Sequence, residues 1–157
     1  MGHVRSFRSH PNHSGSRESN ERDEKAHAFS GGRQGENRGR IATSLGVRVG
    51  AGDVFEPDAL VACGPPPPGD ALEIADPVIV VEVLSPTAAI DHGPKLMGYF
   101  PLPSLAHYLI LDPERRVAIH HKRGQGDIIE SRILSEGVVR LDPPGIEAPV
   151  AEMFAPA

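Results

Sequence analysis

Three residues of this chain carry side chains suited to metal-assisted cleavage of a phosphodiester: Asp58, Glu82 and Lys95. Carboxylate oxygens are ligands that Mg²⁺ takes, with water filling its remaining positions. Such a cation polarises a phosphate and lowers the pKa of a bound water, and a nearby lysine can orient that water. The backbone carbonyl of Val83, which follows Glu82, would supply one more oxygen ligand. These residues predict a site for Mg²⁺ or Mn²⁺.

Glu82 is the one charged residue in the apolar segment 78–84. A run this apolar is typical of a strand that is buried on both faces. An unpaired carboxylate in such a strand costs several kcal/mol, so we expect a cation or a proton to compensate it. Asp58 begins a second apolar stretch, 59–62. Two carboxylates on neighbouring strands would suit one hard divalent cation.

The remaining pattern predicts an α/β or α+β fold, in which one or two helices flank a mixed central sheet. We expect a helix from Asp91 to Phe100, because Asp91 is a good N-cap and Pro101 stops the helix. Asp91 is also spaced to pair with Lys95 across one helical turn. The predicted strands are 47–49, 55–62, 78–84, 106–111, 117–122, 128–134 and 138–141, with a turn at 71–75.

Residues 1–40 differ from the rest of the chain in being polar and rich in Ser, Gly, Asn, Arg and His. Such a segment buries too little apolar surface to offset its ordering entropy, so we expect a disordered tail followed by one domain over 41–157. A short helical turn is expected at 36–45. The tail holds eight Lys and Arg against five Asp and Glu, whereas the domain holds eight against sixteen. The net negative charge of the domain argues against strong nonspecific binding to nucleic acid.

The single cysteine, Cys63, excludes an internal disulfide and fits a reducing cytoplasm. We expect no membrane helix and no signal peptide, since the apolar runs are far shorter than about 20 residues.

Several segments together resemble the Uma-type family of restriction endonucleases, within the PD-(D/E)XK nuclease superfamily. They are Glu56-Pro57-Asp58, then 80–87, then Asp91, Lys95 and Tyr99, then 107–113. The resemblance implies a restriction-endonuclease-like core in which Asp58 and Glu82 are the metal-binding acids. Leu84 stands where the superfamily's lysine would be, and Lys95 in the following helix is implied to replace it. The implied function is a Mg²⁺-dependent DNA endonuclease.

Family members usually carry a helix and a long strand before the first acid. Here 36–45 resembles a remnant of that helix, so the chain looks shortened. This leaves a second hypothesis open: a catalytically inactive, restriction-endonuclease-like module that binds nucleic acid or another partner. A third, weaker hypothesis is a hydrolase of some other phosphoester, because the metal chemistry does not name the substrate.

Four basic residues, Arg115, Arg116, Lys122 and Arg123, are expected to form the one concentrated positive patch of the domain. In a homodimer, these basic edges of the two copies would lie on one DNA-binding face.

The other polar candidates have simpler interpretations. Tyr99 and Tyr108 are expected in the core, and the hydroxyl of Tyr108 is expected to contact water. A structural role is expected for His120 and His121. Cys63 has no visible base beside it.

Overall fold

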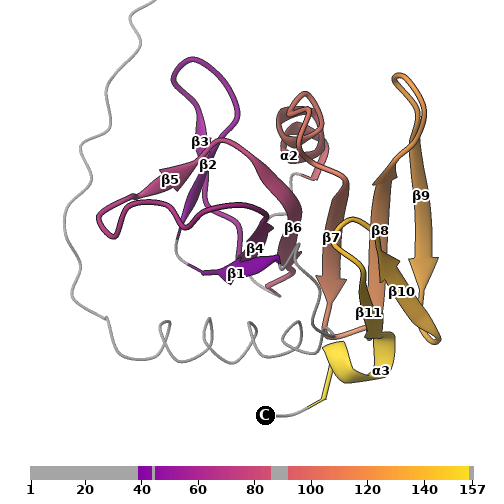
Figure 1. The fold of residues 1–157 in the computed structure, drawn as a ribbon. Helices are drawn as coiled ribbons and strands as arrows, with labels where there is room; N and C mark the ends of the chain where they lie inside the picture. Colours follow the sequence, from indigo (N-terminus) through magenta and orange to yellow (C-terminus); the bar gives the residue numbers. More distant parts are fainter. Residues whose placement is uncertain (1–38, 44, 86–91, 156–157) are drawn as a thin grey trace, which may run out of the picture.

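The structure is a computed structural model, and it describes residues 39–43, 45–85 and 92–155 (Figure 1). The predictions for residues 1–38 and for the Asp91 cap lie outside these residues. The predicted mixed α+β fold is confirmed. Within the described part of the chain, no helix is both long and apolar enough to cross a bilayer.

A six-stranded mixed sheet forms the centre of the domain, in the order β1-β4-β6-β7-β8-β9. Its strands are β1 (Arg40–Ala42), β4 (Ala59–Ala62), β6 (Pro77–Val83), β7 (His107–Asp112), β8 (Val117–Arg123) and β9 (Ile129–Leu134). Strands β6 and β7 are parallel, and every other neighbouring pair in this sheet is antiparallel. A parallel pair needs a crossover connection, and helix α2 (His92–Tyr99) lies in it.

Two smaller sheets pack around the central one (Figure 1). The first contains β2 (Gly46–Arg48), β3 (Val54–Phe55) and β5 (Glu73–Ile74), in the order β3-β2-β5. The second is the hairpin of β10 (Val138–Leu141) and β11 (Ile146–Pro149), which leads into the short helix α3 (Val150–Met153).

The structure corrects four sequence-based expectations. Residues 40–42 form β1 against β4 rather than part of a helical turn, because pairing with the sheet edge overrides a weak local preference. The predicted strand 55–62 is broken between β3 and β4, where Pro57 has no N–H for a ladder. The predicted turn at 71–75 contains β5, which pairs with β2. Strand β11 was not predicted.

Strand β6 is buried on both faces, as its apolar sequence predicts. Ile79 and Val81 face a core formed with β10, β11 and α3, whereas Val80 faces a second core that includes Tyr99 of α2. Side chains alternate along a strand, so Glu82 projects to the same face as Val80. The sheet therefore directs this carboxylate toward α2.

Close packing of α2 on the β2–β3 region gives a first testable prediction, at Gly98. A β-carbon at Gly98 would overlap the ring of Phe55, which packs edge-on against Tyr99 with ring centroids 5.2 Å apart. Gly98→Val should therefore lower the free energy of unfolding by about 1–3 kcal/mol, measured by urea denaturation. Gly93→Val is the matched control, because a β-carbon at Gly93 in the same helix meets open space. Equal losses in both variants would contradict the packing argument.

Candidate active site

Glu82 lies near the end of β6 and is 8% exposed. Two side chains of α2 contact its carboxylate: Lys95 Nζ lies 2.7 Å from Oε2, and the Tyr99 hydroxyl donates to Oε1 at 3.0 Å. Lys95 and Tyr99 are four residues apart, so they lie on one face of the helix. The crossover helix thus brings a cation and a hydroxyl to the carboxylate of the central strand.

Burial raises the pKa of Glu82 above its ordinary value, and the contacts with Lys95 and Tyr99 offset only part of that rise. The Asp58 carboxylate adds to the rise, so the two acids lie within electrostatic reach of one another. Burial and the charge of Glu82 also raise the pKa of Tyr99. The Tyr99 hydroxyl therefore stays protonated near neutral pH and acts as a hydrogen-bond donor.

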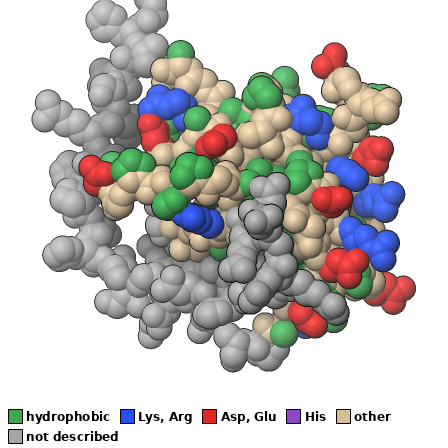
Figure 2. Space-filling view, viewed as in Figure 1, with side chains coloured by type: hydrophobic (Ala, Val, Ile, Leu, Met, Phe, Trp, Pro, Cys, Tyr) green, Lys and Arg blue, Asp and Glu red, His purple; other side chains and the backbone are tan. Residues whose placement is uncertain are grey.

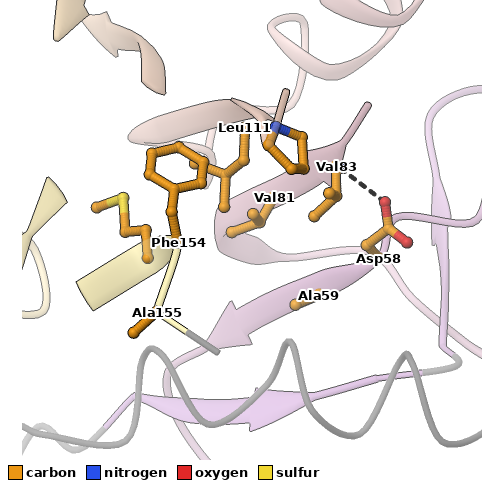
Figure 3. Close-up of a pocket in the computed structure, with 9 residues that line it drawn as sticks. Asp58, Ala59, Val81, Val83, Leu111, Phe154 and Ala155 are labelled. Carbon is orange, nitrogen blue, oxygen red and sulfur yellow. Dashed lines mark hydrogen bonds between the residues drawn. The ribbon is translucent and has the colours of Figure 1, made fainter. Parts of the chain in front are cut away.

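Asp58 directly precedes β4 and is half-buried. Its Oδ2 accepts a hydrogen bond of 2.7 Å from the backbone N–H of Val83 (Figure 3). Ala59 pairs with Val81, and continuing this register by one residue places Asp58 beside Glu82. Because backbone N–H groups lie in the plane of a sheet, the Asp58 carboxylate sits near that plane, just beyond the end of β4.

The backbone of Val83 is directed toward Asp58. Its N–H bonds Asp58, whereas the next N–H, of Leu84, bonds the Leu111 carbonyl of β7 at 2.8 Å. In an extended strand, the N–H and C=O of one residue point to the same side. The Val83 carbonyl is thus directed to the side on which Asp58 lies, as a shared ligand position requires.

The side chain of Lys95 is 38% exposed, while that of Glu82 is 10% exposed. The ammonium therefore bridges a buried carboxylate and solvent. A lysine ammonium has three donors, and the contact with Glu82 uses one of them. The others remain able to hold a water or an anionic oxygen at the mouth of the site.

A cavity of about 210 Å³ lies against the other face of β6 (Figure 3). Its lining residues are Asp58, Ala59, Val81, Val83, Leu111, Pro113, Met153, Phe154 and Ala155. Asp58 is the one acidic residue among them, and Phe154 contributes an aromatic wall from the segment after α3. Asp58 thus borders this cavity, and the β4–β6 register places it beside Glu82.

Of the predicted site positions, the structure pairs Lys95 with Glu82 and Asp58 with the Val83 N–H, and the strand register places Asp58 beside Glu82. The structure also adds Tyr99, which the sequence analysis assigned to the core alone. The signal was present in the sequence, since Tyr99 follows Lys95 by one helical turn. The structure changes one argument as well. Lys95 and Tyr99 offset part of the cost of burying the Glu82 charge, so its burial does not by itself require a metal ion.

The predicted positive patch is wrong. Arg115 and Arg116 precede β8, whereas Lys122 and Arg123 end it, so the two pairs are roughly 20 Å apart. Arg123 donates to the carbonyls of Phe100, Leu102 and Leu105, and Arg115 pairs with Asp112 at 2.8 Å. On the face shown in Figure 2, basic and acidic side chains are intermixed.

The remaining polar candidates lie in the sheet. The Tyr108 hydroxyl is buried and has no hydrogen-bond partner among the described residues, so the expected contact of this hydroxyl with water is wrong. His120 is buried, and its Nε2 lies 2.9 Å from Nδ1 of His107. In the described ranges, no three His, Cys, Asp or Glu residues gather as a metal site. The candidate site has only two carboxylates, together with one carbonyl.

Comparison with known proteins identifies the family. The profile of the Uma2 family, described as "Putative restriction endonuclease", matches residues 18–151. The chain belongs to the Uma2 family. The resemblance drawn from the sequence is thereby confirmed, although the match begins before residue 41, where the domain was expected to start.

Two further proteins are similar to this Uma2 chain. One, named "Uncharacterized protein slr1290", is from Synechocystis sp. and is 38% identical over 73 residues, which are 45% of this chain and 38% of that relative. The matched segment therefore spans well under half the length of that relative. The other is a crystal structure from Anabaena variabilis, described as "a putative nuclease belonging to DUF820". It has a TM-score of 0.65 at 15% identity, over 87% of this chain and 79% of that chain, and it establishes the shared fold.

Proposed function

We propose that this Uma2 protein is a Mg²⁺-dependent endonuclease that hydrolyses phosphodiester bonds of DNA. The observation that carries the proposal is the Lys95–Glu82–Tyr99 cluster beside Asp58, at the end of the central strands. Membership of a family described as "Putative restriction endonuclease" supports the reaction class. The neighbour described as "a putative nuclease" supports it further.

The residues of the site fit a hard divalent cation. Asp58, Glu82 and the Val83 carbonyl offer only oxygen donors, which suit Mg²⁺ or Mn²⁺. Burial raises the pKa of Glu82, and Lys95 and Tyr99 offset part of that rise, so a bound cation would stabilise the anionic form further. When bound, the cation would polarise the phosphate and activate a coordinated water.

The other side chains have distinct roles in this proposal. The Lys95 ammonium orients the attacking water and neutralises charge that develops on the phosphate oxygens. Tyr99 and Lys95 each use one lone pair of the Glu82 carboxylate, which has about four, so sites for a cation remain. Asp58 is fixed by the Val83 N–H, so its second oxygen remains as a ligand.

One observation favours the second candidate, an inactive nucleic-acid-binding or interaction module. Lys95 and Tyr99 satisfy both oxygens of Glu82 without any metal. A fold that had lost catalysis would keep such contacts for stability. The two candidates differ in whether metal binding depends on Glu82.

Calorimetric titration with Mn²⁺ and Mg²⁺ separates the candidates. A functional site should bind one cation with a heat signal that Glu82→Ala removes, because that variant lacks one of the two carboxylates. In parallel, the wild-type chain should nick plasmid DNA with Mg²⁺ or Mn²⁺ and should be inactive in excess chelator. Metal binding that is unchanged in Glu82→Ala would refute the proposed centre. Binding of DNA without cleavage at any metal concentration would favour the inactive module.

A further inference from the structure

Strand β9 forms an open edge of the central sheet (Figure 1). No strand in the described part of the chain pairs with its outer side. Five of its six residues are exposed, and Ile133 retains 76% of its accessible surface. An exposed edge with apolar side chains is a template for pairing with another strand.

The hydrogen bonds of the β8–β9 hairpin show which groups point outward. Gly124 N–H bonds the Ile128 carbonyl at 2.8 Å, whereas Arg123 N–H points to β7 and bonds Ala106 at 2.9 Å. Bonded and non-bonded pairs alternate along an antiparallel ladder. The N–H and C=O groups of Ile129, Ser131 and Ile133 therefore point away from β8.

The sequence of β9, Ile-Glu-Ser-Arg-Ile-Leu, is complementary to itself around Ser131. If two copies pair antiparallel with Ser131 opposite Ser131, then Glu130 faces Arg132 of the second copy, and Ile129 faces its Ile133. Each outward N–H then meets an outward C=O. Registers centred on Glu130 or on Arg132 would instead place like charges opposite each other.

Both faces of the strand agree with this register. Lys122 of β8 lies opposite Glu130, so Glu130 would have a cation on either side: Lys122 of its own chain and Arg132 of the second copy. On the other face, Ile129 and Ile133 would form an apolar row across the two copies. Figure 2 shows basic and acidic side chains intermixed on the face it presents.

We propose that the chain forms a homodimer by antiparallel pairing of β9 with β9 of a second copy, with the two-fold axis at Ser131. The pairing joins two six-stranded sheets into one. It does not touch the Glu82 cluster, since β7 and β8 separate β6 from β9. The inference is therefore independent of the proposed nuclease activity.

Sedimentation velocity of the full chain over a roughly hundredfold concentration range tests the proposal. The wild type should reach twice the 16.8 kDa mass of one chain. Ser131→Pro should remain monomeric, because it removes an outward N–H that β8 does not use. The matched control Glu136→Arg, an exposed charge reversal outside β9, should dimerise like the wild type.

Charge exchange provides the sharper test and does not depend on how well proline is tolerated. Glu130→Arg or Arg132→Glu alone should weaken dimerisation at least about tenfold, because like charges then face each other. An equimolar mixture of these two variants should form a heterodimer, and the double variant should dimerise again. A wild type that is monomeric throughout would overturn the proposal, with Glu130 and Arg132 then acting as charges that protect the edge. The proposal would also be overturned if none of these substitutions affected dimerisation.

Discussion

Glu82→Gln is expected to lower the rate of DNA cleavage at least about 100-fold, measured as nicking of supercoiled plasmid in Mg²⁺. The amide has nearly the same shape and still accepts a hydrogen bond from Tyr99, but it is a much weaker ligand for a hard cation. Lys95 would lose its anionic partner while remaining partly exposed to water, so the fold should survive. The loss would therefore report on chemistry rather than on stability.

Lys95→Met separates the two roles within the cluster. It leaves both carboxylates in place, so Mn²⁺ binding should persist, whereas the cleavage rate should fall by a similar factor. Glu136→Gln, purified in the same way, controls for contaminating nucleases, since Glu136 is exposed and lies outside the site. Equal cleavage by Glu82→Gln and the wild type would show that Glu82 is not a metal ligand in the reaction.

Much of the central sheet was predictable because its strands are long and locally consistent. Segment 78–84 is apolar enough to be a buried strand, and the two hairpins from β7 to β9 carry clear turn residues. The fate of short segments was not predictable. Arg40–Ala42 and Glu73–Ile74 become strands only because an edge is available for pairing, and no local pattern reveals which edge that is.

The site was predictable in its composition but less so in its contacts. Glu82 was identified because it is a carboxylate within an apolar strand, and Asp58 and Lys95 were assigned their roles by the family resemblance. The spacing of Tyr99 one helical turn after Lys95 was visible in the sequence, but an aromatic residue at that position is usually core, so its hydrogen bond to Glu82 was not predicted. The predicted positive patch was wrong because Arg116 and Lys122 lie at opposite ends of β8, although they are close in the sequence.

The buried pair His107 and His120 was missed for a related reason, because its members lie on different strands. His107 pairs with Lys122 in the β7–β8 ladder, and His120 lies two residues before Lys122 on the same face. Their ring nitrogens meet at 2.9 Å, and the backbone of Asp142 also lies close to His107. Burial lowers the pKa of both residues, that of His120 to about 4.

The surroundings of the pair reinforce its neutral state. Nearby groups also disfavour a proton on His120: His107 of β7, Arg132 of β9, and His121 and Lys122 of β8. Asp142, after β10, opposes the shift at His107, but burial outweighs it.

The chain should therefore lose stability in mild acid, between about pH 6.5 and about pH 4. Histidines in the unfolded chain take up protons below their ordinary pKa, whereas the folded pair stays neutral, so falling pH favours unfolding. A shift of His120 from 6.5 to about 4 corresponds to about 3 kcal/mol in the free energy of unfolding, measured by urea denaturation at several pH values.

The double variant His107→Leu, His120→Leu should lose most of this acid sensitivity, because replacing both partners by apolar groups removes the titration and leaves no unpaired nitrogen. His121→Gln should retain it, since His121 is only half-buried and bonds Ser131 instead. Comparing slopes with pH, rather than absolute stabilities, removes the contribution of Glu82. Its raised pKa acts in the opposite direction and is common to all three proteins. An acid slope that is the same in the wild type and the double variant would show that the pair does not govern it.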